Sequence, residues 1–184
     1  MRPRETRVEG IEEVPVIASV REDLAGANSL EEGVRRALSR VGESMGWLFG
    51  AYWEVEAGAG RLRVRQTWCA RAFHRTGFEA DSRAHRFGPG EGLPGRVWAA
   101  GAPVWVVDAQ GELNFPRHAA ATREGLHAAV AFPASSAGLL YGVVEFYTDS
   151  LRAVTPALLP VFERLGEEIG GFLAAHGAAA ADPA

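Results

Sequence analysis

The sequence contains one cysteine among its 184 residues and no lysine. A single cysteine excludes an internal disulfide and any metal site built from several cysteines. All the basic residues are therefore arginine, which we attribute to a coding bias rather than to an arginine-specific function. The formal net charge of −4 gives no general attraction to nucleic acid. We therefore expect no nucleic-acid partner.

Long apolar runs are also missing. No segment approaches the roughly 20 apolar residues that cross a bilayer. The charged N-terminus MRPRETRVEG is not followed by the apolar region of a secretory signal. The sequence therefore predicts no membrane partner and a cytoplasmic location. Hydrophobic residues at 47% and charged residues at 23% are typical of one globular domain with a sizeable core.

Two segments have the periodicity of amphipathic helices. The first follows Ser29, with Glu32 at the spacing of a capping box, and ends at Gly46. The last begins at Thr155-Pro156 and runs to about His176. Its apolar arc is broad, and three glycines would let another helix approach it closely: Gly166, Gly170 and Gly171.

Shorter patterns between these helices predict the rest of the fold. Alternating or β-branched runs indicate strands at 47–56, 61–68, 104–107, 126–134 and 139–148, of which 104–107 is expected to be buried. Helices are expected at 73–86 and 116–124, and a two-turn helix begins at Leu93. Because hairpins dominate, the fold class is α+β with a central antiparallel sheet.

The chain is organised around residues 87–108, FGPGEGLPGRVWAAGAPVWVVD. Five glycines and three prolines here fix the shape of a loop that leads into the two-turn helix. Gly92 and Gly95 are the positions where we expect the backbone to require glycine. Gly101 then ends the helix, and Pro103 prevents its continuation.

This stretch, together with NFPR at 114–117, GLHAAVAFPA at 125–134 and YGVVEFYT at 141–148, resembles a GAF domain. The likeness is to GAF modules of bacterial sensor histidine kinases and related signalling proteins. It implies a GAF domain at 28–176, an N-terminal extension at 1–27 and a disordered tail at 177–184. The extension is either mobile or packs against the domain or a second subunit.

The resemblance also implies that the terminal helices pack on one face of the sheet and that a loop and helices cover a ligand pocket on the other face. Residues of the cover and of the sheet are then expected to line this pocket. We expect these to be Trp68, Phe87, Leu93, Trp98, Phe115, His118, Phe132 and Tyr147, with Leu113 nearby. The alternative is that the aromatic side chains fill the cavity.

Three ligand classes of GAF relatives find little support in these residues. The position of the bilin-attaching cysteine reads PRHA at 116–119, and a lone Cys69 does not supply the several cysteines of the GAF methionine sulfoxide reductases. NFPR lacks the lysine of the cyclic-nucleotide signature. His74, His85, His118 and His127 lie near the cover, and His118 is the candidate axial ligand if the domain holds haem.

The sequence thus predicts a GAF sensory module that is not an enzyme and has no metal site, and it names no cofactor. A small ligand in the pocket would act through a signalling protein in trans or through a homodimer of the terminal helices. The alternatives are a ligand-free interaction scaffold with a filled pocket and, with less support, a haem or chromophore sensor.

Overall fold

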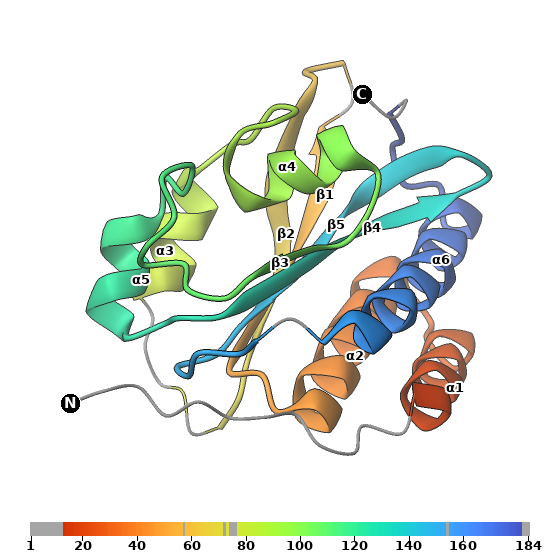
Figure 1. Cartoon of the computed structure of the whole chain (residues 1–184). Helices are drawn as coiled ribbons and strands as arrows, with labels where there is room; N and C mark the ends of the chain where they lie inside the picture. Colours follow the sequence, from red (N-terminus) through yellow and green to blue (C-terminus); the bar gives the residue numbers. More distant parts are fainter. Residues whose placement is uncertain (1–12, 57, 72, 74–76, 154, 182–184) are drawn as a thin grey trace.

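The computed structural model describes residues 13–56, 58–71, 73, 77–153 and 155–181. A five-stranded antiparallel sheet lies at its centre, with helices on both faces (Figure 1). The strands follow the order β2-β1-β5-β4-β3, which confirms the predicted α+β class. Their bounds are β1 Phe49–Glu56, β2 Arg61–Cys69, β3 Val104–Val106, β4 Ala129–Ser136 and β5 Leu139–Tyr147.

The helices divide into two groups, one on each face of the sheet (Figure 1). The terminal group consists of α1 (Glu13–Ala25), α2 (Leu30–Met45) and α6 (Leu159–Ala175), which follows the 3₁₀ turn Pro156–Leu158. The cover group consists of α3 (Gly77–Ala84), α4 (Gly92–Ala100) and α5 (His118–Glu124). None of the described helices combines the length and hydropathy needed to span a membrane.

Helix α2 begins and ends where the sequence predicts. Ser29 Oγ accepts the backbone N–H of Glu32 at 3.1 Å, and Gly46 closes the helix at φ 66°. The Glu32 carboxylate, however, accepts the backbone N–H of Asn28, at 2.9 Å, rather than that of Ser29. Local capping therefore fixes this helix, with a partner shifted by one residue from the usual capping box.

Helix α1 packs on the other terminal helices rather than on the sheet. Val16, Val20 and Leu24 are buried in the core that α2 and α6 share with the sheet. Part of the N-terminal extension thus packs against the domain of the same chain. Residues 1–12 of the extension lie outside the described residues.

Glycines bring α6 unusually close to β4. A Cβ atom at Gly166 would lie 2.1 Å from the backbone oxygen of Pro133, and one at Gly170 would lie 2.3 Å from that of Ser135. These two glycines therefore serve packing on the sheet within one chain, not approach to a partner helix. Gly171 differs, because a Cβ there would have no neighbour within 4 Å.

Several boundaries differ from the predicted ones. The strand expected at 104–107 is present as β3, but it ends at Val106. The expectation that it is buried is wrong, because β3 is an edge strand and Val104 and Trp105 are only half-buried. α3 begins at Gly77, and residues 74–76, with His74, lie outside the described residues. In the segment expected to be a disordered tail, Ala181 exchanges two backbone hydrogen bonds with Leu140, at 2.8 and 2.9 Å.

Candidate functional site

The cover over the sheet is built on the glycine-rich loop before α4. Gly90 and Gly92 have φ values of 79° and 59°, which residues other than glycine rarely adopt. Gly95 lies so close to Gly88 that a Cβ would come within 2.1 Å of its carbonyl oxygen. The loop therefore closes on itself and directs the α4 side chains Leu93, Val97 and Trp98 into the core.

Asn114 ties the next part of the cover to this loop. Its Oδ1 accepts the N–H of Gly92 at 2.9 Å, and its Nδ2 donates to the carbonyl oxygen of Gly90 at 2.8 Å. Asn114 belongs to the irregular connection 107–117 between β3 and α5. This contact gives the NFPR segment its role, because it places Phe115 and Arg117 over the sheet.

Arg117 extends into the protein and pairs there with Glu145 of the central strand β5. Its two terminal nitrogens lie 2.7 Å from Oε1 and 2.7 Å from Oε2 of Glu145, and neither side chain is exposed to solvent. This is a bidentate contact, the strongest arrangement of a guanidinium and a carboxylate. A charged pair therefore occupies the interior between the cover and the sheet.

Two hydroxyl groups complete the polar contacts. Arg117 donates to Ser82 Oγ of α3 at 2.9 Å and to the Tyr147 hydroxyl at 2.8 Å. Tyr147 in turn donates to Glu145 Oε2 at 2.9 Å. Burial lowers the pKa of Arg117, but Glu145 outweighs this and holds that pKa above its ordinary value. The guanidinium thus stays charged, while burial raises the pKa of Tyr147 and keeps its hydroxyl neutral.

Aromatic rings surround the charged pair. The guanidinium carbon of Arg117 lies 4.9–5.5 Å from the centres of five rings: Trp53, Phe78, Phe87, Phe115 and Tyr147. These are cation–π distances. We call this arrangement the Arg117 cage: Arg117 together with the five rings, Ser82 and Glu145.

The structure brings five of the eight predicted pocket residues together on the cover side of the sheet. They are Phe87, Leu93, Trp98, Phe115 and Tyr147, all buried in one cluster. His118 lies outside that cluster, where its side chain is exposed and its Nε2 contacts the carbonyl oxygen of Gln110 at 2.7 Å. Leu113 is fully exposed.

Trp68 and Phe132 lie on the face of the sheet that the terminal helices cover. The expectation that they line the same space as Tyr147 is therefore wrong. A bulge in the β1–β2 pairing inserts one extra residue into β2, between Val64 and Gln66. It turns Trp68 toward α2, where the ring packs on Gly42. Side chains alternate along β4, and Ala129 and Ala131 face the cover. Phe132 therefore points to the other face, where it packs on Phe162 of α6.

Arg117 and Glu145 were missed by sequence reasoning, as were Trp53, Phe78 and Ser82. The sequence did contain one indication of the buried pair, at Glu145. Glu145 is a lone carboxylate within the most apolar strand, YGVVEFYT, and an acidic side chain is almost never buried unless it is paired. The sequence does not indicate which basic residue pairs with Glu145, because Arg117 lies 28 residues away.

The other candidate residues lie apart from the cage or are already engaged. His85 stacks on Phe87 and contacts the carbonyl oxygen of Asp81, and His127 pairs with Asp108 at 3.0 Å. Cys69 is half-buried, and burial raises its pKa to about 11, so its thiol is a poor nucleophile. Among the described residues, no group of three His, Cys, Asp or Glu is placed to hold a metal ion.

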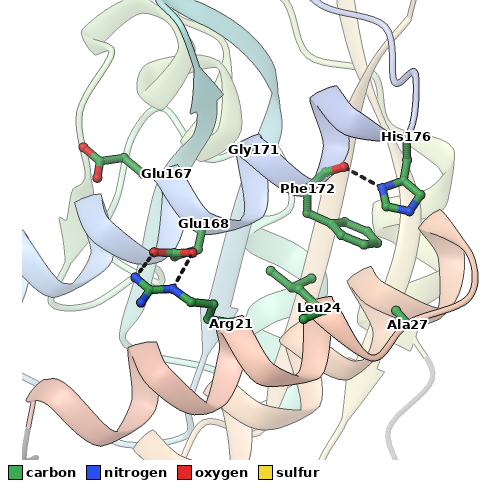
Figure 2. Close-up of a pocket in the computed structure, with 9 residues that line it drawn as sticks. Arg21, Leu24, Ala27, Glu167, Glu168, Gly171, Phe172 and His176 are labelled. Carbon is green, nitrogen blue, oxygen red and sulfur yellow. Dashed lines mark hydrogen bonds and ion pairs between the residues drawn. The ribbon is translucent and has the colours of Figure 1, made fainter.

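A separate groove of about 530 Å³ lies on the other face of the molecule, between α1 and α6 (Figure 2). Arg21 of α1 pairs with Glu168 of α6 across it, with an Nε–Oε2 distance of 3.1 Å. Leu24 and Phe172 add apolar surface, and the Phe172 ring lies 4.0 Å from that of His176.

A sheet with terminal helices on one face and a loop-and-helix cover on the other defines an α+β domain. A family model for the GAF domain matches residues 27–174. The chain therefore belongs to the GAF domain family, whose members are sensory and regulatory modules, as its sequence resemblance predicts. No curated protein matches the sequence.

Solved structures of GAF domains and related proteins share the fold. The free methionine-R-sulfoxide reductase of Neisseria meningitidis, in complex with its substrate, has a TM-score of 0.74 at 15% identity, covering 95% of this chain and 96% of that chain. The GAF domain of Coxiella burnetii phosphoenolpyruvate-protein phosphotransferase also reaches 0.74, at 16% identity, with 89% and 93% covered. The A. aeolicus Nlh2 GAF domain, in an inactive state, has 0.68 at 20% identity, with 89% and 96% covered. At these identities the likeness is one of fold alone.

Proposed function

We propose that this GAF domain is a regulatory module in which the Arg117 cage is the sensory site and the Arg117 side chain is its resident occupant. A small molecule acts by replacing that side chain. The observation that carries the proposal is the bidentate contact of Arg117 with Glu145 inside a shell of aromatic rings. An apolar enclosure with a few convergent polar groups is the usual form of a small-molecule site.

Stability alone is a weak reason for a charged pair in this place. Replacing a buried ion pair by apolar side chains of similar volume is often neutral, or stabilising by about 1–4 kcal/mol. A carboxylate on the central strand, fully enclosed, therefore has a better explanation in recognition than in folding.

The two partners of the pair are held very differently. Glu145 is fixed in the middle strand of the sheet, whereas Arg117 is the last residue of the irregular connection 107–117. Side-chain contacts hold that connection to the glycine-rich loop and α4, through Asn114 and through Glu112, which pairs with Arg96 at 2.7 Å. We infer that this connection is the part that moves when the occupant changes.

A change of occupant must then be transmitted to another protein chain, either a signalling partner or a second copy of this chain. Leu113, fully exposed on the moving connection, offers one surface that a signalling partner in trans can detect. A homodimer through the terminal helices, with the groove between α1 and α6 at the contact, is the other proposed route (Figure 2). A cytoplasmic location is part of this proposal.

A second candidate function is a ligand-free interaction scaffold. The occupation of the cage by Arg117 favours it, because the chain's own side chains then fill the space permanently. The haem or chromophore alternative has no comparable support, since His118 lies outside the cage.

Native mass spectrometry of protein purified from its own host separates the first two candidates. Arg117→Ala removes the resident occupant, so we expect this variant to retain a small molecule at one per chain. Wild type and the surface control Arg35→Ala, at an exposed position of α2, should be largely empty. A folded Arg117→Ala variant that carries nothing would leave the scaffold as the function.

A further inference from the structure

The Arg117 cage satisfies a guanidinium group almost completely. The four N–H bonds on the two terminal nitrogens of Arg117 match four acceptors: the two Glu145 oxygens, Ser82 Oγ and the Tyr147 hydroxyl. An ammonium group has three donors that diverge from one point, so it cannot make the parallel pair of bonds to Glu145.

The rings add a preference for a planar cation. Five ring centres lie within 5.5 Å of the guanidinium carbon, and they come from the sheet, from α3 and from both loops of the cover. Cations, and planar guanidinium groups above all, stack favourably on such faces. A neutral molecule of the same shape would lose both this attraction and the charge of Glu145.

The inner nitrogen of Arg117 marks the direction of the stem. Nε is buried and has no hydrogen-bond partner, although each terminal nitrogen has two. The cage thus recognises the head of the side chain and makes no polar contact with the part that leads back to α5. Any molecule that presents the same head along the same path meets the same contacts.

We propose that the Arg117 cage is a binding site for a small molecule that bears a guanidinium group, with Arg117 as its built-in competitor. This rests on the proposed function and adds the chemical class of the ligand. The tethered side chain holds the site closed until the free ligand, by mass action, takes its place and releases the connection 107–117.

The test uses the fragment that Arg117→Ala deletes. Ethylguanidinium replaces the side chain beyond Cβ, ethylammonium keeps the charge without the planar head, and ethylurea keeps the planar shape without the charge. Binding is measured by calorimetry and by the thermal midpoint, at millimolar probe and constant ionic strength. In Arg117→Ala we expect ethylguanidinium to bind at least tenfold more tightly than either other probe, and at least tenfold more tightly than it binds wild type.

The double variant Arg117→Ala/Glu145→Gln is the matched control, because it has the same space and no buried charge. Its preference for ethylguanidinium over ethylurea should fall below threefold. If Arg117→Ala is unfolded alone, ethylguanidinium should restore its fold while ethylammonium does not.

Equal binding of the three probes would overturn the inference, and so would an unchanged preference in the double variant or a failure of ethylguanidinium to restore the fold. These outcomes are distinct from a failure of the proposed function. A different small molecule retained from the host by Arg117→Ala would refute the ligand class and leave the sensory role. Empty protein in that experiment would refute the sensory role, whatever the probes do.

Discussion

Arg117 and Glu145, 28 residues apart in sequence, meet in a bidentate ion pair with no solvent contact, on the cover side of the sheet. The pair joins a connection at the surface to the central strand. Replacing one of the two residues should lower the free energy of unfolding much more than replacing both. A single replacement leaves a buried charge without its partner, whereas the double replacement leaves no buried charge.

We therefore expect Arg117→Met to lower the free energy of unfolding by about 3–5 kcal/mol, since it leaves Glu145 buried without a partner. The double variant Arg117→Met/Glu145→Leu should lose less than half as much. Urea denaturation of the wild type, both single variants and the double variant measures the coupling. Additive losses would show that the two charges do not depend on each other.

Gly95→Ala should destabilise the protein by about 1–3 kcal/mol, because its Cβ would collide with the backbone oxygen of Gly88 at 2.1 Å. Gly88→Ala is the control in the same loop. Its Cβ would meet chiefly the Arg61 side chain, at 3.1 Å, which can move aside, so the change should stay within about 0.5 kcal/mol. Equal midpoints in chemical denaturation would refute the crowding argument.

Adjacent glycines on α6 offer a second matched pair. Gly170→Ala should cost about 1–3 kcal/mol, since its Cβ would lie within 2.5 Å of three backbone atoms of Ser135. Gly171→Ala meets nothing within 4 Å and should stabilise the helix by up to about 1 kcal/mol. Thermal midpoints of the two variants should therefore move in opposite directions. A shift in the same direction would contradict the packing of α6 on β4.

Cys69 should react slowly with maleimide. A pKa raised by burial from 9.0 to about 11 leaves roughly 100-fold less thiolate at neutral pH, and the thiolate is the reactive form. The labelling rate should rise with pH well beyond 9, and Cys69→Ala should keep the fold. Rapid, complete labelling of the native protein at pH 7 would contradict the burial and reopen a redox role.

The proposed homodimer should have about twice the chain mass of 19.7 kDa in light scattering at micromolar concentration. Gly171→Arg places a large charged group in the groove between α1 and α6 at an open position, so it should give a folded monomer. Ala99→Arg, exposed on α4 at the other face, should remain dimeric. Leu173 is fully buried, so a charge there would test folding instead of association. Wild-type protein that is monomeric throughout this range would remove the dimer.

The sequence by itself determined the elements whose signals are local. Ser29 and Gly46 delimit α2, and Gly101 ends α4. The turn between β4 and β5 lies at Ala137-Gly138, within the interval 135–138 that the two predicted strands leave between them. The requirement for glycine at Gly92 and Gly95 was also readable, since the loop closes through contacts a few residues apart. These features depend on backbone geometry and capping, which neighbouring residues control.

Only the tertiary structure decided which side chains share the interior of the cover. The extra residue in β2 places Trp68 on the opposite face of the sheet from the one that strict alternation predicts. No residue type in that strand indicates the bulge. Phe132 and Tyr147 are on opposite faces because the register of two strands, rather than alternation within one, sets their relation. The partner of Glu145 comes from a connection between other elements, so the charged centre of the site exists only once the sheet, α3 and the cover have come together.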